Sequence, residues 1–129
     1  AAHAADPRPH VNAIIDFGDM CRHLRVVDLA ITIVYALQHV DEDQTVRDCM
    51  LAILQGYQSQ YPLSKQEIQI MYHVIMARLS QSILMATRAY RHNPANDYIL
   101  VSQKGVRRLI RQLDAMNYQE LQHLFLSVL

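Results

Sequence analysis

Two aspartates near the N-terminus, Asp16 and Asp19, are the residues of this sequence best placed for chemistry. They follow the apolar, β-branched run of residues 11–15 and enclose Gly18 in the order Asp-Phe-Gly-Asp. Carboxylates on a turn at the end of a buried strand suit a hard cation such as Mg²⁺, which prefers oxygen ligands and retains waters and phosphate oxygens. The sequence therefore predicts a candidate magnesium site, and a turn with two solvated acids is the plainer alternative.

A strand and a buried helix are expected to position this pair. The strand is predicted from about residue 10 to 16, and no later stretch is an obvious partner for it. Because one short strand cannot satisfy its own backbone groups, we expect its partner in a hairpin of the first residues or outside this chain. Residues 25–40 are apolar nearly all round, which predicts a central, buried helix. Asp28 in its first turn is either favourably placed near a helix N-terminus or a buried carboxylate that holds a neighbouring loop.

Helical periodicity and breaker residues divide the rest of the chain into further helices. The acidic linker of residues 41–44 is expected to cap the next helix. Ser64 to Glu67 has the pattern of a capping box and starts a helix predicted to run to about Arg91. Residues 95–113 are predicted to be helical, with Gly105 as a bend or break.

The predicted fold is mainly α and consists of one domain. Residues 1–24 form a loop and strand that carry the Ile-Asp-Phe-Gly-Asp segment, and residues 25–129 form a helical bundle. A length of 129 residues with 51% hydrophobic composition is enough for a single core. No apolar run is long enough to cross a membrane, so we expect no membrane partner.

Charge and cysteine content exclude other classes of protein. Lys plus Arg and Asp plus Glu are 12 each, so no net field attracts nucleic acid or an anionic membrane. The one basic cluster, Arg107, Arg108 and Arg111, is interpreted as a solvated helix face rather than a nucleic-acid site. Cys21 and Cys49 have no Cys-x-x-Cys spacing, which favours buried reduced thiols in a cytoplasmic protein. The seven histidines show no zinc-ligand spacing.

Several stretches together resemble a known family. Ala-Ile-Ile-Asp-Phe-Gly-Asp-Met at residues 13–20, followed by Asp-Leu-Ala at 28–30, resembles the metal-binding segment of the aminoglycoside phosphotransferase and choline kinase-like family, which has a protein-kinase-like fold. The likeness is greatest to its hydroxylysine kinase branch, which includes phosphotransferase domains fused to class III aminotransferases. Residues 61–63, 77–82 and 93–98 resemble the helical C-terminal region of that branch.

The resemblance implies roles for the three aspartates. Asp16 matches the aspartate that coordinates Mg²⁺ on the nucleotide phosphates, the counterpart of the aspartate in the kinase Asp-Phe-Gly motif. Asp19 matches a second acidic residue near the metal, and Asp28 is expected to brace the catalytic loop. The whole enzyme would transfer the γ-phosphoryl group of ATP or GTP to a hydroxyl of an amine-bearing metabolite similar to hydroxylysine.

Parts of the family pattern are absent from this sequence. The catalytic loop His-Gly-Asp-x-x-x-x-Asn and the nucleotide-binding N-terminal lobe are missing, so we expect a C-terminal lobe portion with no catalytic residue of its own. Because phosphoryl transfer depends on positioning and charge neutralisation, this portion is expected to be inactive alone. The alternative is a non-catalytic helical interaction module whose apolar surface is covered by self-association or by a partner. No residue is identified for binding the acceptor, and fusion to an aminotransferase domain stays open.

Overall fold

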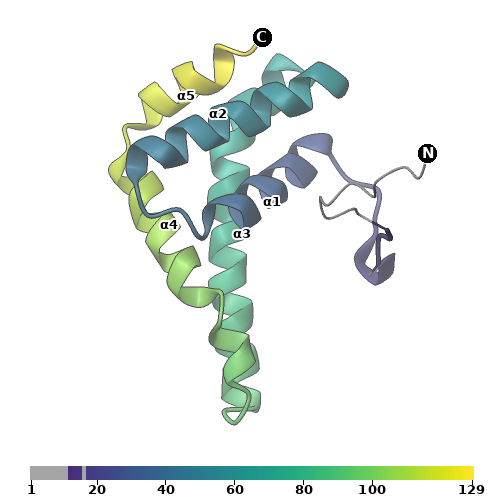
Figure 1. Ribbon diagram of the computed structural model, residues 1–129, viewed down its shortest axis with the longest axis vertical. Helices are drawn as coiled ribbons and strands as arrows, with labels where there is room; N and C mark the ends of the chain where they lie inside the picture. Colours follow the sequence, from purple (N-terminus) through teal and green to yellow (C-terminus); the bar gives the residue numbers. More distant parts are fainter. Residues whose placement is uncertain (1–11, 16) are drawn as a thin grey trace, which may run out of the picture.

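The computed structural model describes residues 12–15 and 17–129, which are mainly α-helical (Figure 1). No strand occurs among these residues, so the mainly α class is confirmed. In chain order the elements are η1 (Phe17–Asp19), α1 (Arg25–Leu37), α2 (Asp43–Gln60), α3 (Lys65–His92), η2 (Asp97–Leu100), α4 (Gln103–Ala115) and α5 (Tyr118–Leu126).

The long helix α3 is the axis of the bundle, and α1, α4, α5 and η2 all pack against it (Figure 1). Helix α2 packs on α1 and α5. One continuous core joins the helices, and its fully buried larger side chains are Phe125, Leu29, Ile33, Leu37, Met50, Leu54, Ile68, Met71, Ile75, Leu79, Leu109 and Leu113. Within the described residues, no helix combines the length and the apolar character that crossing a bilayer requires.

Helix α1 is buried along one face only, which corrects the prediction of a central helix buried nearly all round. The buried residues recur at the helical period and are Val26, Leu29, Ala30, Ile33, Val34 and Leu37. The opposite face is open, because Tyr35 is 55% exposed and Asp28 is exposed as well. The helix ends at Leu37, before the predicted residue 40. An apolar helix of this kind therefore has a second face that the described residues leave partly uncovered.

Two of the predicted helix caps differ in outcome. The capping box at Ser64 is confirmed: the Ser64 hydroxyl accepts from the Glu67 backbone N–H, and the Glu67 carboxylate accepts from the Ser64 N–H. The acidic cap before α2 is wrong, because the N-cap residue Glu42 makes no side-chain capping bond. Asp43 lies inside the first turn, and its carboxylate accepts instead from Gln112 Nε2 on α4, at 2.9 Å.

The prediction that residues 95–113 are helical, with a bend or break at Gly105, is wrong in the position of the interruption. The structure has a short 3₁₀ segment, η2, followed by α4. Gly105 lies inside α4 and packs against the loop after α1, where a Cβ atom would collide with the carbonyl oxygen of Gln38. This glycine is therefore required for close helix–loop packing and not for a bend.

The predicted N-terminal strand is wrong for residues 12–15, which have no strand hydrogen bonding and are exposed. The other positions of that strand, His10, Val11 and Asp16, lie outside the described residues, as does any hairpin formed by the first residues. The physical reason is that a lone strand has no ladder partner among the described residues to satisfy its backbone groups.

Candidate functional site

The predicted metal segment is described only in part. Asp16 lies outside the described residues, and for Asp19 only the backbone, at the end of η1, is described. The neighbouring apolar side chains are exposed, with Ile15 at 82% and Phe17 at 60%. Among the described residues no group of three His, Cys, Asp or Glu side chains is close enough to hold a metal ion. The magnesium site at Asp16 and Asp19 therefore stays a prediction.

Asp28 stands at the edge of a pocket beside this segment. The pocket has a volume of about 260 Å³ and is lined by Met20, Cys21, His23, Val27, Asp28 and Ile31. Asp28 is exposed in the first turn of α1, so its interpretation as a buried carboxylate is wrong, whereas its placement near a helix N-terminus fits. Cys21 is also exposed, which corrects the expectation of a buried thiol, and Cys49 is half-buried.

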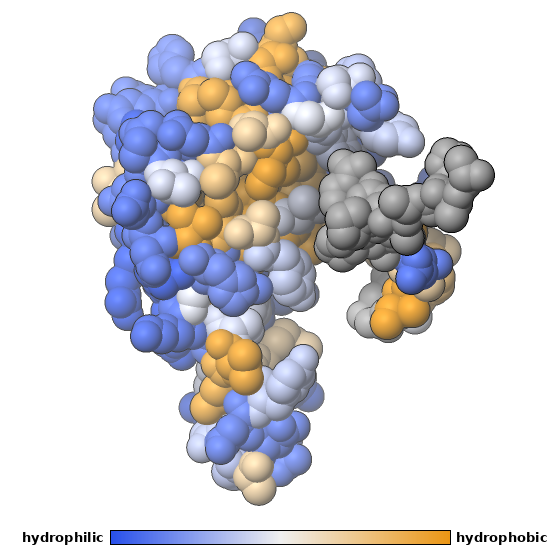
Figure 2. Space-filling model, in the orientation of Figure 1, coloured by the Kyte–Doolittle hydropathy of each residue, from blue (hydrophilic) through white to orange (hydrophobic). Residues whose placement is uncertain are grey.

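A second pocket adjoins the first and shares two of its residues. It has a volume of about 390 Å³ and lies between α1 and α3, lined by Val27, Ile31, Val74, Ala77, Arg78 and Gln81. We call it the α1–α3 groove. Val27 and Ile31 line both pockets, so one apolar floor on α1 runs from the side of Met20 to Arg78. Figure 2 shows apolar surface over the region where α1 and α2 lie in Figure 1, whereas the surface along α4 is hydrophilic.

Arg78 is the one charged residue in the lining of the α1–α3 groove, and its side chain is half-buried. Its Nη1 donates to Gln81 Oε1 at 3.0 Å, and its Nη2 donates to the hydroxyl of Tyr35 at 3.3 Å. The guanidinium carbon lies 5.8 Å from the centre of the Tyr35 ring, within the range of a cation–π contact. Two neutral side chains thus hold this cation in place.

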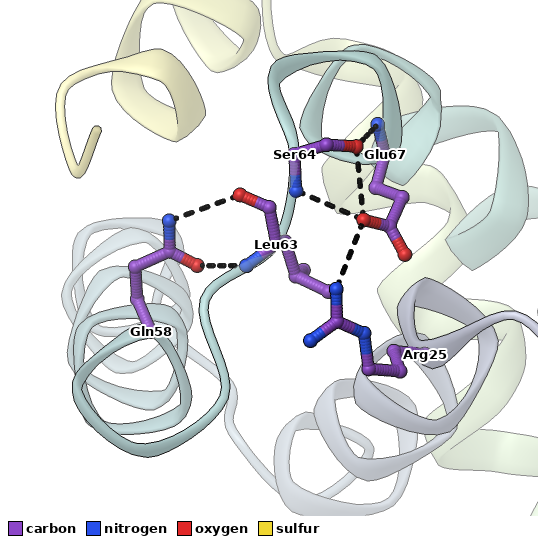
Figure 3. A network of polar contacts seen from close by, with 5 residues as sticks. All are labelled: Arg25, Gln58, Leu63, Ser64 and Glu67. Atoms are coloured by element: carbon purple, nitrogen blue, oxygen red, sulfur yellow. Dashed lines mark hydrogen bonds and ion pairs between the residues drawn. The ribbon is translucent and has the colours of Figure 1, made fainter.

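A polar network at the start of α3 includes Arg25 in the first turn of α1 (Figure 3). Glu67 Oε2 accepts from the Ser64 backbone N–H at 2.9 Å and from the Ser64 hydroxyl at 2.9 Å, and lies 3.7 Å from Arg25 Nη2. Gln58 pairs with both backbone groups of Leu63 in the preceding loop. The bonds from Ser64, backbone first, and then the charge of Arg25 lower the pKa of Glu67. Because Arg25 is the first residue of α1, its ion pair with Glu67 joins the start of that helix to the start of α3.

The comparisons with known proteins point to one kind of enzyme. The chain is 33% identical to a hydroxylysine kinase of Danio rerio over 103 residues, which are 78% of this chain and 28% of that kinase. It is 29% identical to a hydroxylysine kinase of Mus musculus over 116 residues, 89% of this chain and 30% of the kinase. A third, of Xenopus laevis, is 32% identical over 95 residues. The chain is homologous to hydroxylysine kinases. No protein-family model and no solved structure matches it.

The homology covers most of this chain but a small part of the kinases. The chain spans less than a third of the length of the curated hydroxylysine kinases that it matches. The kinase likeness inferred from Asp16, Asp28 and the stretch at residues 77–82 is therefore confirmed as a relationship, and the roles of individual residues stay predictions. Arg78 lies within that stretch, but sequence reasoning gave it no role. The sequence signal that could have identified Arg78 is a single arginine between apolar positions of a predicted helix.

The basic cluster on α4 is structural in part. Arg107 and Arg111 are exposed, as predicted for a solvated face. Arg108 instead donates from Nη2 to the carbonyl oxygen of Gln38 at 2.9 Å and forms an ion pair with Asp41. Together with Gly105 and Gln112, it fastens the loop between α1 and α2 to α4. Gly105, Arg108 and Gln112 therefore stabilise the C-terminal end of α1.

Proposed function

We propose that this chain is the C-terminal part of a small-molecule kinase. In the whole protein it would transfer the γ-phosphoryl group of ATP or GTP to a hydroxyl of a small amine-bearing metabolite similar to hydroxylysine. The observation that supports this most strongly is the 33% identity to a hydroxylysine kinase over 78% of the chain. The fragment alone is expected to be inactive, because the catalytic loop and the nucleotide-binding lobe of the kinase-like fold have no match in it.

The roles proposed for the three aspartates follow the family resemblance. Asp16 would hold Mg²⁺ on the nucleotide phosphates, with Asp19 near the same ion, and magnesium would neutralise charge on the transferred group. Asp28 would brace the catalytic loop supplied by the rest of the protein. Its exposed position at the edge of the pocket beside Met20 supports this role, since a carboxylate there is accessible to a further segment. We also propose a cytoplasmic location, where two free thiols persist.

The test is phosphoryl transfer by the full-length protein. Hydroxylysine, Mg²⁺ and either ATP or GTP are supplied, and phosphorylated product is measured by mass spectrometry. Asp16→Ala is expected to abolish transfer and to remove the rise in melting temperature that magnesium nucleotide produces in the wild type. Asp48→Ala, at an exposed acidic position on α2, is the control and is expected to retain both. Transfer that survives Asp16→Ala would contradict the proposed metal role.

A second function is favoured by the exposed apolar side chains of the N-terminal segment. Ile14, Ile15 and Met20 are each more than three-quarters exposed, at 76%, 82% and 77%. Surfaces of this kind often mark interaction sites, so a non-catalytic helical interaction or dimerisation module is the rival proposal. Sedimentation velocity of the 129-residue chain separates the two ideas: a monomer at micromolar concentration counts against self-association, and a concentration-dependent dimer supports it.

A further inference from the structure

The α1–α3 groove contains Arg78, a cation with no anionic partner among the described residues. The ion pairs within the described part of the chain join Arg25 to Glu67, Arg47 to Glu120 and Arg108 to Asp41, and none includes Arg78. Hydrogen bonds to Tyr35 and Gln81 orient the guanidinium, and both partners are neutral, so no described residue compensates its charge. A half-buried positive charge is costly unless it is paired, so the groove favours an anion beside Arg78.

The geometry of the guanidinium favours a carboxylate. Nε of Arg78 is covered by protein and makes no hydrogen bond, so a ligand meets the two terminal nitrogens. Each terminal nitrogen gives one N–H to Tyr35 or Gln81 and keeps a second N–H. One planar guanidinium that keeps an N–H on each terminal nitrogen can donate to the two oxygens of a carboxylate. The cation–π contact with Tyr35 keeps this fork from turning away.

The apolar floor of the groove suits the rest of such a ligand. Val27 and Ile31 are four residues apart on α1, a rise of about 6 Å, which is enough for a short alkyl chain. The same two residues line the pocket of Met20 and Cys21, directly after Asp19 of the predicted metal segment. A ligand whose carboxylate contacts Arg78 therefore extends its other end toward the segment where phosphoryl transfer is proposed. A groove of about 390 Å³ is within the usual size of a small-molecule site.

We propose that Arg78 binds the carboxylate of the acceptor, a hydroxyl-bearing amino acid, with Val27 and Ile31 against its methylene chain. This inference rests on the proposed kinase function and deepens it. It names the residue that binds the carboxylate, which is the group that an amino acid has and a simple hydroxylated amine lacks. Tyr35 and Gln81 are positioning residues, since they hold the guanidinium rather than contact the acceptor.

The experiment measures binding to the full-length protein without nucleotide, by isothermal titration calorimetry. The probes are hydroxylysine and the hydroxylated diamine that has the same chain but lacks the carboxylate. The wild type is expected to bind hydroxylysine about 10- to 100-fold more tightly, the range for hydrogen bonds to a charged group. Arg78→Gln is expected to remove this preference while the affinity for the diamine stays within about twofold, and Arg78→Lys to restore part of it.

Matched variants separate this subsite from a structural role. Arg88→Gln, an exposed arginine on the same helix, is expected to keep the full preference. Tyr35→Phe removes one acceptor from Arg78 and is expected to reduce the preference without removing the charge, which provides a second variant if Arg78→Gln does not fold.

The results that would overturn the carboxylate subsite differ from the result that would overturn the kinase function. An equal loss of affinity for both probes in Arg78→Gln, together with a lower melting temperature, would show that Arg78 acts through the structure of the protein and would overturn the proposal. A wild type that binds the two probes equally, or neither, would overturn it too. Absence of phosphoryl transfer with the carboxylate preference intact would instead remove the kinase function and leave the subsite.

Discussion

The two phenylalanines of the chain lie in its two contrasting regions. Phe125 on α5 is 1% exposed in the core of the helical bundle, whereas Phe17 in the N-terminal segment is 60% exposed. Because the two side chains are identical, the difference in their exposed fractions comes from their surroundings. The bundle supplies packing partners to Phe125, and the described residues around Phe17 supply none. Apolar character thus predicts a tendency to be buried, and the partner element decides whether burial occurs.

Phe125→Ala should produce the largest effect, because it removes a fully buried aromatic ring. The free energy of unfolding is expected to fall by about 3–5 kcal/mol. Phe17→Ala is the matched control and is expected to change it by less than about 0.5 kcal/mol. Urea denaturation of the 129-residue chain, followed by circular dichroism, measures both. Equal losses in the two variants would contradict the contrast between the regions.

The two helix glycines Gly56 and Gly105 give a second, smaller contrast in packing. Gly105→Ala places a methyl group against the Gln38 carbonyl and is expected to destabilise the chain by about 1–3 kcal/mol. Gly56→Ala, in α2, meets no atom within 4 Å and is expected to stabilise it by about 0.5–1 kcal/mol. Opposite shifts in melting temperature would confirm that the loop after α1 packs tightly on α4. A stabilising Gly105→Ala would contradict that close approach.

Local signals in the sequence predicted the helices well where the cap is made by neighbouring residues. The capping box of Ser64 and Glu67 forms within one turn, so no distant partner is needed. The acidic cap before α2 was wrong because the N-cap residue Glu42 makes no capping bond, and the neighbouring Asp43 accepts from Gln112, 69 positions away in the chain. A long-range contact of this kind leaves no periodic pattern in the sequence.

The candidate site was predictable to a smaller extent. The segment around Asp16 and Asp19 identified the kinase relationship, because its residue types follow one another in a short stretch. The α1–α3 groove was not predictable, since Ile31 and Arg78 are far apart in sequence and meet only when α1 crosses α3. The burial of Asp28 was wrong for a related reason, because no segment in the described residues covers that side of α1.

Ser64→Ala should have an intermediate effect at the boundary where the bundle holds the start of α1. Loss of the capping hydroxyl is expected to lower the free energy of unfolding by about 1 kcal/mol at pH 7. The pKa of Glu67 is lowered in the folded chain, so its stabilisation is full above the unfolded pKa of about 4.3 and is lost as the pH falls through the folded pKa. The variant is therefore expected to lose less stability on acidification than the wild type. Urea titrations at pH 7 and in steps below about pH 4.3 measure this, and parallel pH profiles would contradict it.

Arg25→Gln tests the ion pair between the first residue of α1 and Glu67 on α3, and its expected effect is the smallest of those considered. The side chain of Arg25 is 51% exposed and its nitrogen lies 3.7 Å from Glu67, so water screens much of the attraction. The expected loss is at most about 0.5 kcal/mol, below that of Ser64→Ala. Arg88→Gln, an exposed arginine outside the ion pairs of the described residues, is the control and should change stability less. Because Arg25 also lowers the pKa of Glu67, that pKa is expected to rise in the variant, as followed by NMR titration of the carboxyl carbon. A loss above about 1 kcal/mol would mean that the start of α1 depends on this ion pair rather than on its apolar face.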